Sequence, residues 1–454
     1  MSDERSTTLV DRWQSRFEGR LLAPAHHDYP AACRIWNGMI ERTPALIARC
    51  TSNADVATAI ELARSEELPL SVRGGGHGVA GNAICQHGVV VDLTLLKRVA
   101  VDPAVREAVA GAGLLWGEFD AAAESHGLAT TGGQVSHTGI AGLTLGGGLG
   151  YLMSKHGATC DNLLSVELVA ADGEVMTASE DVNPDLFWAM RGAGANFGVV
   201  TSFRYRLHPL PGVFAGMMLH PRDRAAELAV FYREFLRDSP DELDTTFGFL
   251  NGPDGTPLVG VIGVYAGPSD EGEDVLRPLR KFGPPVVDTI RPMRYTEVQQ
   301  MLDAAVPVGN RYYWKSNFVD TLRDELVEVL RQGADAMPSP YSLIMLFETK
   351  GAIRRVAKEK MAFDHRDANF EMSIIANWTD PVEDARNMAW ARDLWKTCQP
   401  FVMDAVYSNH MTSDEPIERV RSAYGAKYAR LERLKAQYDP TNLFRMNHNI
   451  PPQA

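Results

Sequence analysis

The sequence lacks the features that mark membrane and nucleic-acid-binding proteins. No run in its 454 residues approaches the 18 uninterrupted apolar residues of a membrane-spanning helix, so we expect no membrane span. Basic residues are in the minority, with 45 Lys and Arg against 58 Asp and Glu and a net charge of −13. Without a basic stripe the chain has no means of contacting many phosphates, so we expect no nucleic-acid partner.

Cysteine is also scarce, and its distribution excludes two further classes. The five cysteines are odd in number and share no metal-ligand spacing, which predicts reduced thiols and no metal site. The first five residues, MSDER, are polar and lack the basic and apolar run of a signal peptide. Together these absences predict a cytoplasmic protein. The cysteines are Cys33, Cys50, Cys85, Cys160 and Cys398.

What the chain does have is the composition of a globular protein. Apolar residues make up 45% and charged residues 23% of the sequence, which is sufficient for large buried cores. The length exceeds that of one ordinary core and predicts two or three domains.

The most informative segment is Leu70–Gly78, which reads LSVRGGGHG. A short strand runs into consecutive glycines, whose backbone can turn sharply and present N–H groups to phosphate oxygens. Arg73 adds a fixed cation beside them. Gly76, Gly78 and Gly81 also match G-x-G-x-x-G, but residues 79–92 read as a loop and an apolar strand. Since the dinucleotide fingerprint should open a helix, the Rossmann interpretation fails.

Further segments in a fixed order make the chain resemble a known family. After the glycine loop come GGQVSHTGIAG at 132–142, LTLGGGLG at 143–150, CDN at 160–162, DLFWAMR at 185–191 and NFGV at 196–199. The end of the chain reads YDPTNLFR at 438–445 and NIP at 449–451. This set spans nearly the whole chain and resembles the berberine-bridge-enzyme-like FAD-linked oxidases of the vanillyl-alcohol-oxidase superfamily.

The resemblance implies FAD bonded through the imidazole of His77 to the 8α-methyl of its ring. Relatives with a second bond use a cysteine two residues after the second Gly-Gly pair, and here that position holds Val135. Valine forms no thioether, so we expect one covalent bond, as in the bacterial branch of the family. Cys160 lies well downstream and is interpreted as a small buried thiol.

The second glycine loop is expected to pass beside the flavin ring. His137 and Thr138 are polar residues in a small, apolar segment, and they either contact the flavin or satisfy local backbone groups. By resemblance, Thr138 stands where the family controls the access of oxygen, and it is short enough to leave room for O2. Leu143 is expected to pack close by.

Candidates for the catalytic base lie in the second half of the chain. Tyr407-Ser-Asn409-His410 resembles a family segment whose last residue is a basic tyrosine in several members, and here it is His410. Imidazole accepts a proton near neutral pH, although a half-exposed loop histidine is the alternative. Tyr407 and Asn409 are candidates for contacts with flavin or substrate.

Two carboxylates on predicted strands are further candidates. Alternation in 370–378 places Glu371, Ser373 and Asn377 on one face, which indicates either solvent or a pocket. Glu348 ends the strand 343–348 and is treated in the same way. Lys315 is either a surface lysine or buried on the flavin side. Asp185–Arg191 is interpreted as core structure.

The complete cofactor prediction follows the matched motifs residue by residue. The expected contacts with FAD are Arg73, Gly74, Gly75, Gly76, His77, Gly78, Gly81, Asn82, Gly133, Gln134, Val135, His137, Thr138, Gly139, Gly142, Leu143, Gly146, Gly147, Asn196, Gly198, Val199, Asn409, Asn447 and Asn449.

The pattern of elements predicts an α+β protein. Alternating strands and helices up to Pro209 fit a PCMH-type FAD-binding domain of two α/β subdomains over 1–210, with a core at about 38–210. After the Pro-Gly boundary at 209–212, longer strands predict a substrate domain over 211–416 with a largely antiparallel sheet flanked by helices. The tail, 417–454, is expected to be helical to Leu434 and, by resemblance, to complete the FAD domain.

The resulting hypothesis is an FAD-dependent oxidase, monomeric or dimeric, acting on a small organic substrate and O2. Hydride passes from an alcohol, a carbohydrate or a natural-product intermediate to the flavin, and O2 is reduced to H2O2. Two alternatives stay open. One is a flavin dehydrogenase that uses another acceptor, and the other is a flavin-loaded binding protein without turnover.

Overall fold

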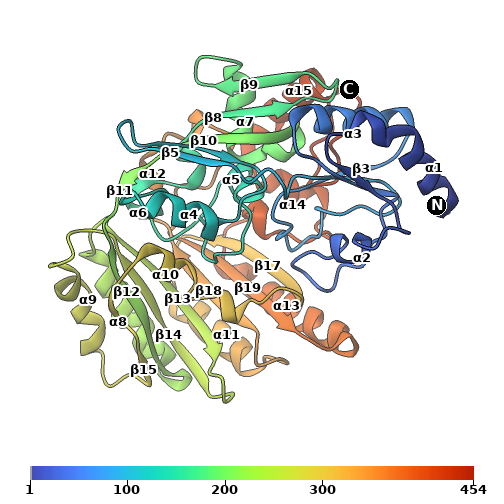
Figure 1. Cartoon of the computed structure of the whole chain (residues 1–454). Coiled ribbons are helices and arrows are strands. Elements are labelled where there is room, and N and C mark those ends of the chain that lie inside the picture. Colours follow the sequence, from blue (N-terminus) through green and yellow to red (C-terminus); the bar gives the residue numbers. More distant parts are fainter. Residues whose placement is uncertain (1–2, 454) are drawn as a thin grey trace.

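The first 210 residues form two sheets and a short ribbon in the computed structural model, which describes residues 3–453. The first sheet has the order β1 (Arg20–Leu22), β2 (Leu46–Arg49), β4 (Val89–Asp92) and β3 (Leu70–Arg73), in which β2, β4 and β3 are parallel. Helix α3 (Asn53–Ser65) packs against it, with α1 (Asp3–Trp13) and α2 (Tyr29–Ala32) alongside (Figure 1).

Helix α3 shows why this region folds as its sequence predicts. The Ser52 side chain accepts a hydrogen bond from the Asp55 N–H and caps the helix. The apolar positions spaced three and four residues apart, from Val56 to Ala63, are buried. Helix α1 ends at Trp13 and is followed by the 3-10 turn Gln14–Arg16.

The second sheet is antiparallel throughout. Its order is β5 (Val99–Asp102), β6 (Glu107–Gly111), β10 (Val199–Arg206), β8 (Leu163–Val169) and β9 (Val175–Ser179). Beside it lie α4 (Trp116–Glu124), α5 (Ile140–Leu145), α6 (Met153–His156) and α7 (Pro184–Ala193), and β7 (Leu128–Ala129) pairs with β11 (His208–Pro209). The first glycine loop follows β3 and the second follows β7, so each begins after a strand of the N-terminal part.

The large sheet is formed by residues 213–378 and has eight strands. Along it run β15 (Val287–Asp288), β12 (Val213–Pro221), β14 (Pro257–Tyr265), β13 (Leu243–Asn251), β18 (Leu343–Glu348), β19 (Phe370–Trp378) and β17 (Arg311–Val319), with β16 (Arg291–Met293) beside β12. Every pairing is antiparallel. The mixed α+β fold with this antiparallel sheet is the one the sequence predicted.

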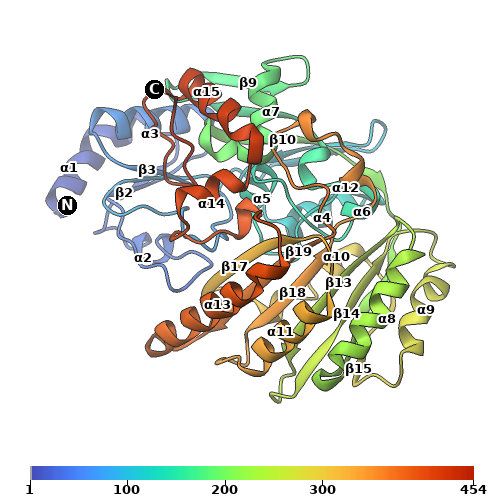
Figure 2. The ribbon, with the colours of Figure 1, turned by 180° about the vertical axis from the view of Figure 1, so that it is seen from behind.

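Longer helices cover the outer face of the large sheet. Seen from behind, α8 (Ala225–Arg237), α9 (Gly272–Lys281), α11 (Asp324–Asp335) and α13 (Asp384–Cys398) lie on that face (Figure 2). The inner face packs against the N-terminal part, with α10 (Tyr295–Gln299) and α12 (Ala352–Arg355) in between. No helix within residues 3–453 is long and apolar enough to cross a bilayer.

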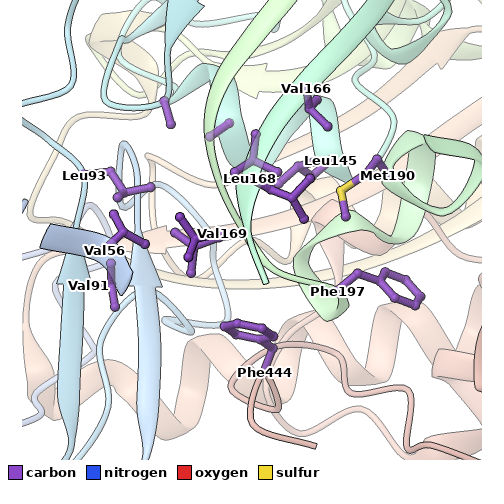
Figure 3. Close-up of a cluster of buried hydrophobic side chains, with 14 of the residues drawn as sticks. Val56, Val91, Leu93, Leu145, Val166, Leu168, Val169, Met190, Phe197 and Phe444 are labelled. Carbon is purple, nitrogen blue, oxygen red and sulfur yellow. The ribbon is translucent and has the colours of Figure 1, made fainter. Parts of the chain in front are cut away.

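The C-terminal tail returns to the N-terminal part. Leu431, Phe444 and Ile450 join a buried cluster with side chains of both N-terminal sheets, such as Val91 and Val169 (Figure 3). The tail is not one helix to Leu434: α14 (Ile417–Ser422) and α15 (Tyr428–Tyr438) are separated by Gly425, whose φ of +53° interrupts the helical path.

Candidate functional site

A cavity of about 340 Å³ lies where the N-terminal part, the large sheet and the tail meet. Its wall includes Gly74–Gly78 after β3, residues of the second glycine loop from Gln134 to Leu149, and the segment 407–411. The inner face of β17, β18 and β19 forms another side, and Phe444 to His448 of the tail a further one. The motifs singled out in the sequence are thus brought to one site from distant positions.

The two glycine loops touch each other at the cavity wall. A Cβ on Gly75 would stand 2.5 Å from the Gly139 Cα, so only glycine allows this approach. Gly76 has a φ of +66°, in the left-handed region that glycine adopts without strain. Among the hydrogen bonds of the described residues, none is donated by the backbone N–H of Gly74 to Gly78. These free donors can bind anionic oxygens.

His77 lies between an indole and a second imidazole. Its ring stacks on Trp36 at 4.2 Å, and its Nε2 is 3.1 Å from Nδ1 of His137. His137 in turn lies 3.9 Å from the carboxylate of Asp303. Burial, reinforced by the neighbouring His137, lowers the pKa of His77 to about 3, so its imidazole is neutral at physiological pH.

The strongest polar arrangement in the cavity belongs to His410. Its Nδ1 is 2.9 Å from the Glu371 carboxylate and 2.9 Å from the Ser373 hydroxyl. Glu371 and Ser373 are fully buried, so they meet no solvent and are held in place by this contact. Because Nδ1 is engaged by Glu371 and Ser373, Nε2 is the nitrogen left to act on a ligand.

Tyr407 and Asn409 attach the segment carrying His410 to the second glycine loop. The Tyr407 hydroxyl accepts hydrogen bonds from the Gly148 N–H at 2.9 Å and from the Asn409 amide at 2.8 Å. That amide also donates to the Leu143 carbonyl at 3.1 Å. Burial raises the pKa of Tyr407 well above its usual range, so its role here is to position the segment.

Glu348 lies away from the cavity, contrary to expectation. Its carboxylate accepts a hydrogen bond from Thr245 at 2.6 Å and lies 3.4 Å from the Lys350 ammonium. Strand alternation explains the error, because Met345 and Phe347 line the cavity and residue 348 therefore points to the opposite face. Lys315 is on that outer face too, buried and paired with Glu415 at 2.6 Å, so it is neither a surface lysine nor on the flavin side.

Most of the expected cofactor residues lie in the cavity wall. Those that line it are Gly74, Gly75, Gly76, His77, Gly78, Asn82, Gln134, Val135, Thr138, Gly139, Gly142, Leu143, Gly146, Asn196, Gly198, Asn409 and Asn447. Those outside the lining are Arg73, Gly81, Gly133, His137, Gly147, Val199 and Asn449. The outer residues support the wall: Arg73 donates to the Ala32 carbonyl, and a Cβ on Gly147 would meet the ring of Phe363.

The two positions considered for a second covalent bond differ in location. Val135 lines the cavity and offers no thiol. Cys160 is fully buried with its sulfur 3.5 Å from that of Met361, and it does not line the cavity. Burial raises the pKa of its thiol to about 12.

Several wall residues were missed by sequence reasoning. They are the apolar side chains from the inner face of the large sheet, together with Tyr424, Met446 and His448 of the tail. His448 is partly exposed, and its desolvation in the wall lowers its pKa to about 4. Alternation in 343–348 was visible in the sequence, but nothing local indicates which face of a strand meets the cavity.

The residues present fit FAD. A Cβ on Gly78 or Gly142 would meet no atom within 4 Å, because both glycines border open space in the cavity. The buried Asn447 oxygen has no hydrogen-bond partner among the described residues and is left for a ligand. Free N–H donors, glycines beside open space and apolar walls suit a diphosphate and a flat ring system.

Comparisons with known proteins agree with this fit. The family model described as FAD binding domain matches residues 44–179, and the one described as berberine and berberine like matches residues 406–451. An FAD-linked oxidoreductase of Dictyostelium discoideum is 31% identical, covering 98% of each chain. The chain belongs to the berberine-bridge-enzyme-like FAD-linked oxidases. It is thus an FAD-dependent oxidase with a small-molecule substrate, as its sequence predicted.

Solved structures resemble this oxidase along its whole length. 6-Hydroxy-D-nicotine oxidase from Arthrobacter nicotinovorans has a TM-score of 0.88 at 31% identity and covers 96% of this chain and 98% of its own. Xylooligosaccharide oxidase from Myceliophthora thermophila has a TM-score of 0.87 at 22% identity, covering 98% and 100%. The second likeness shows the fold alone.

Proposed function

We propose that this oxidase carries FAD on a single covalent bond from His77 and uses His410 as the base that deprotonates its substrate. When bound, FAD would supply the acceptor for the substrate's hydride and the two electrons that reduce O2 to H2O2. The His410–Glu371–Ser373 contact is the observation that carries the catalytic part. A buried carboxylate at Nδ1 stabilises the imidazolium that forms when Nε2 takes a proton.

The attachment through His77 rests on its electronic state and surroundings. A neutral imidazole has a lone pair with which to bond carbon, and the lowered pKa keeps His77 in that form. Stacking on Trp36 and contact with His137 hold the ring in one orientation at the cavity wall. Val135 supplies no second bond, and Cys160 does not reach the cavity lining.

The remaining parts of the proposal concern organisation. We assign residues 1–210 to an FAD-binding domain, 211–416 to a substrate domain and 417–454 to a segment that completes the first. The shared cluster of both N-terminal sheets with Leu431 and Phe444 supports that assignment. Five unpaired cysteines are compatible with a cytoplasmic protein, as a monomer or dimer.

The test of the base compares three variants in anaerobic flavin reduction by stopped-flow absorbance. His410→Ala should slow reduction by about 10²–10⁴-fold with unchanged flavin content. Glu371→Gln should slow flavin reduction less than His410→Ala does. The imidazole of His410 remains, but the imidazolium no longer has a carboxylate to stabilise it. Glu348→Gln is the matched control, a buried strand carboxylate outside the cavity, and should reduce at the wild-type rate. Reduction of the His410→Ala protein at the wild-type rate would remove His410 as the base.

The attachment is tested separately by acid precipitation. The wild-type polypeptide should keep its flavin in the pellet, and His77→Ala should release it. Release from the wild type, or a second flavin adduct at Cys160 in peptide mass spectra, contradicts the single bond at His77. Consumption of dissolved oxygen distinguishes the oxidase from a dehydrogenase with another acceptor, and anaerobic bleaching by any compound excludes a binding protein without turnover.

A further inference from the structure

The part of the cavity wall that comes from residues 213–378 is almost entirely apolar. Its one polar side-chain atom is the indole Nε1 of Trp314, which is buried and has no hydrogen-bond partner among the described residues. None of these residues carries a charge, a hydroxyl or an amide in its side chain. They are Leu302, Val306, Trp314, Leu343, Met345, Phe347 and Ile375. The contrast with the glycine loops, which offer backbone N–H groups, divides the cavity into a polar cofactor side and an apolar side.

Polar groups do occur on the inner face of the large sheet, but those of β19 are already engaged, and the unpaired hydroxyl of Ser316 on β17 lies outside the cavity lining. Glu371 and Ser373 are committed to His410. Asn377, on the same face of β19, accepts a hydrogen bond from Asn310 at 2.9 Å and donates to the Ala305 carbonyl at 3.0 Å. The sheet therefore has few side-chain donors or acceptors left for a ligand.

His410 lies at the edge of this apolar wall. Its ring packs edge-on against Trp314, with the centroids 5.0 Å apart, and lies 6.4 Å from the ring of Phe347. A ligand that reaches His410 thus lies against Trp314 and Phe347. It meets one polar group at one end and hydrocarbon along its body.

We propose that the substrate is a ring-bearing apolar molecule with one polar group, a hydroxyl or an amine, on the carbon that is oxidised. This inference rests on the proposed function. The C–H hydride goes to the flavin, the O–H or N–H proton goes to His410, and a C=O or C=N bond forms. A carbohydrate carries a hydroxyl on most carbons. The single N–H of Trp314 can satisfy only one of them, so the others buried against this wall would lose their water without gaining a partner.

The test uses ring compounds of similar size and rising hydroxyl number with the FAD-loaded protein. The FAD-loaded protein is titrated anaerobically with cyclohexanol, cis-1,3-cyclohexanediol and myo-inositol. Cyclohexylamine and xylobiose are titrated in the same way. Binding is followed as a change in the flavin absorbance. Each added hydroxyl should weaken binding by about tenfold or more, since an apolar pocket discriminates against an added hydroxyl by up to about 10². Binding of myo-inositol or xylobiose as tight as that of cyclohexanol overturns the proposal.

A pair of variants connects the preference to the wall. Met345→Gln adds an amide at similar side-chain volume and should narrow the ratio of cyclohexanol to diol affinity. Met217→Gln, on β12 and outside the cavity lining, should leave this affinity ratio unchanged. If Met345→Gln also leaves the ratio unchanged, the apolar wall does not determine the preference. Failure of the proposed function gives a different result from failure of the substrate proposal. In that case apolar ligands would bind, but no compound would bleach the flavin.

Discussion

Thr138 illustrates how a single side chain can affect one half of the reaction. It lines the cavity in the second glycine loop, near Val135 and Gly139. Replacing Thr138 by Leu adds volume beside the expected flavin position, and overpacking of about 1–3 kcal/mol corresponds to roughly tenfold or more in rate. We expect slower reoxidation by O2 with flavin reduction by substrate nearly unchanged, measured in separate half-reactions.

The control for Thr138→Leu is Thr177→Leu, an exposed threonine on β9. It makes the same chemical change far from the cavity lining and should alter neither half-reaction. Equal losses in both half-reactions of Thr138→Leu would instead place Thr138 in the substrate pocket.

The positions of single residues were predictable where a motif surrounds them. His77 and His410 stand out in the sequence because glycines or a Tyr-x-Asn segment flank them, and both line the cavity. Glu371 was one of two equal candidate carboxylates, and the structure places it against His410. The other candidate, Glu348, lies away from the cavity. Alternation shows which residues of a strand share a face, but not which face points to the cavity.

At the scale of elements, helix α5 forms part of the cavity wall. Gly142 lies within it at open space, so a methyl group there meets no protein atom. Gly142→Ala should therefore raise the thermal stability of the flavin-free protein slightly, by roughly 0.5–1 kcal/mol of helix propensity. The same methyl occupies cofactor space, and flavin content should fall, with binding weakened by about tenfold or more.

The measurements for Gly142→Ala are the melting temperature without flavin and the flavin-to-protein absorbance ratio after loading. Gly425→Ala is the matched contrast, since its φ of +53° puts the strain in the backbone. That variant should lose about 1–2 kcal/mol of stability. A fall in flavin-free stability for Gly142→Ala would show that the open space is needed for folding.

Elements defined by local pattern were predicted well. The strands 343–348 and 370–378 have the expected bounds. The break at Gly425 was missed because one glycine does not outweigh a helical pattern on both sides. The strand order of the large sheet could not be predicted from the sequence, because its strand pairs join segments that are distant in the sequence.

For the molecule as a whole, the contact between α4 and α10 joins the N-terminal part to the segment 295–310. Asp120 on α4 accepts a hydrogen bond from Gln299 on α10 at 2.8 Å, and both are buried. Burial raises the pKa of Asp120 to about 8. Between about pH 4, where an unfolded Asp titrates, and pH 8, the folded state holds one more proton than the unfolded state.

The free energy of unfolding should therefore fall as the pH rises through this window, by up to about 1.4 kcal/mol per pH unit. Asp120→Asn keeps the hydrogen bond and never ionises, so its melting temperature should exceed that of the wild type increasingly toward pH 8. Thermal melts from pH 5 to pH 9 measure this. Asp238→Asn, an exposed carboxylate after α8, should follow the wild type. Parallel curves for Asp120→Asn and the wild type would mean that Asp120 is ionised throughout.

The cavity wall is completed by segments that follow both glycine loops in the sequence. Tyr424, Phe444 and His448 lie in the wall, and Tyr407 fastens the segment of His410 to the second glycine loop. Before these later segments dock, the two glycine loops border an open site. We therefore expect a variant in which residues 407–448 cannot dock to keep His77 in place but to lack an enclosed site in which to use it.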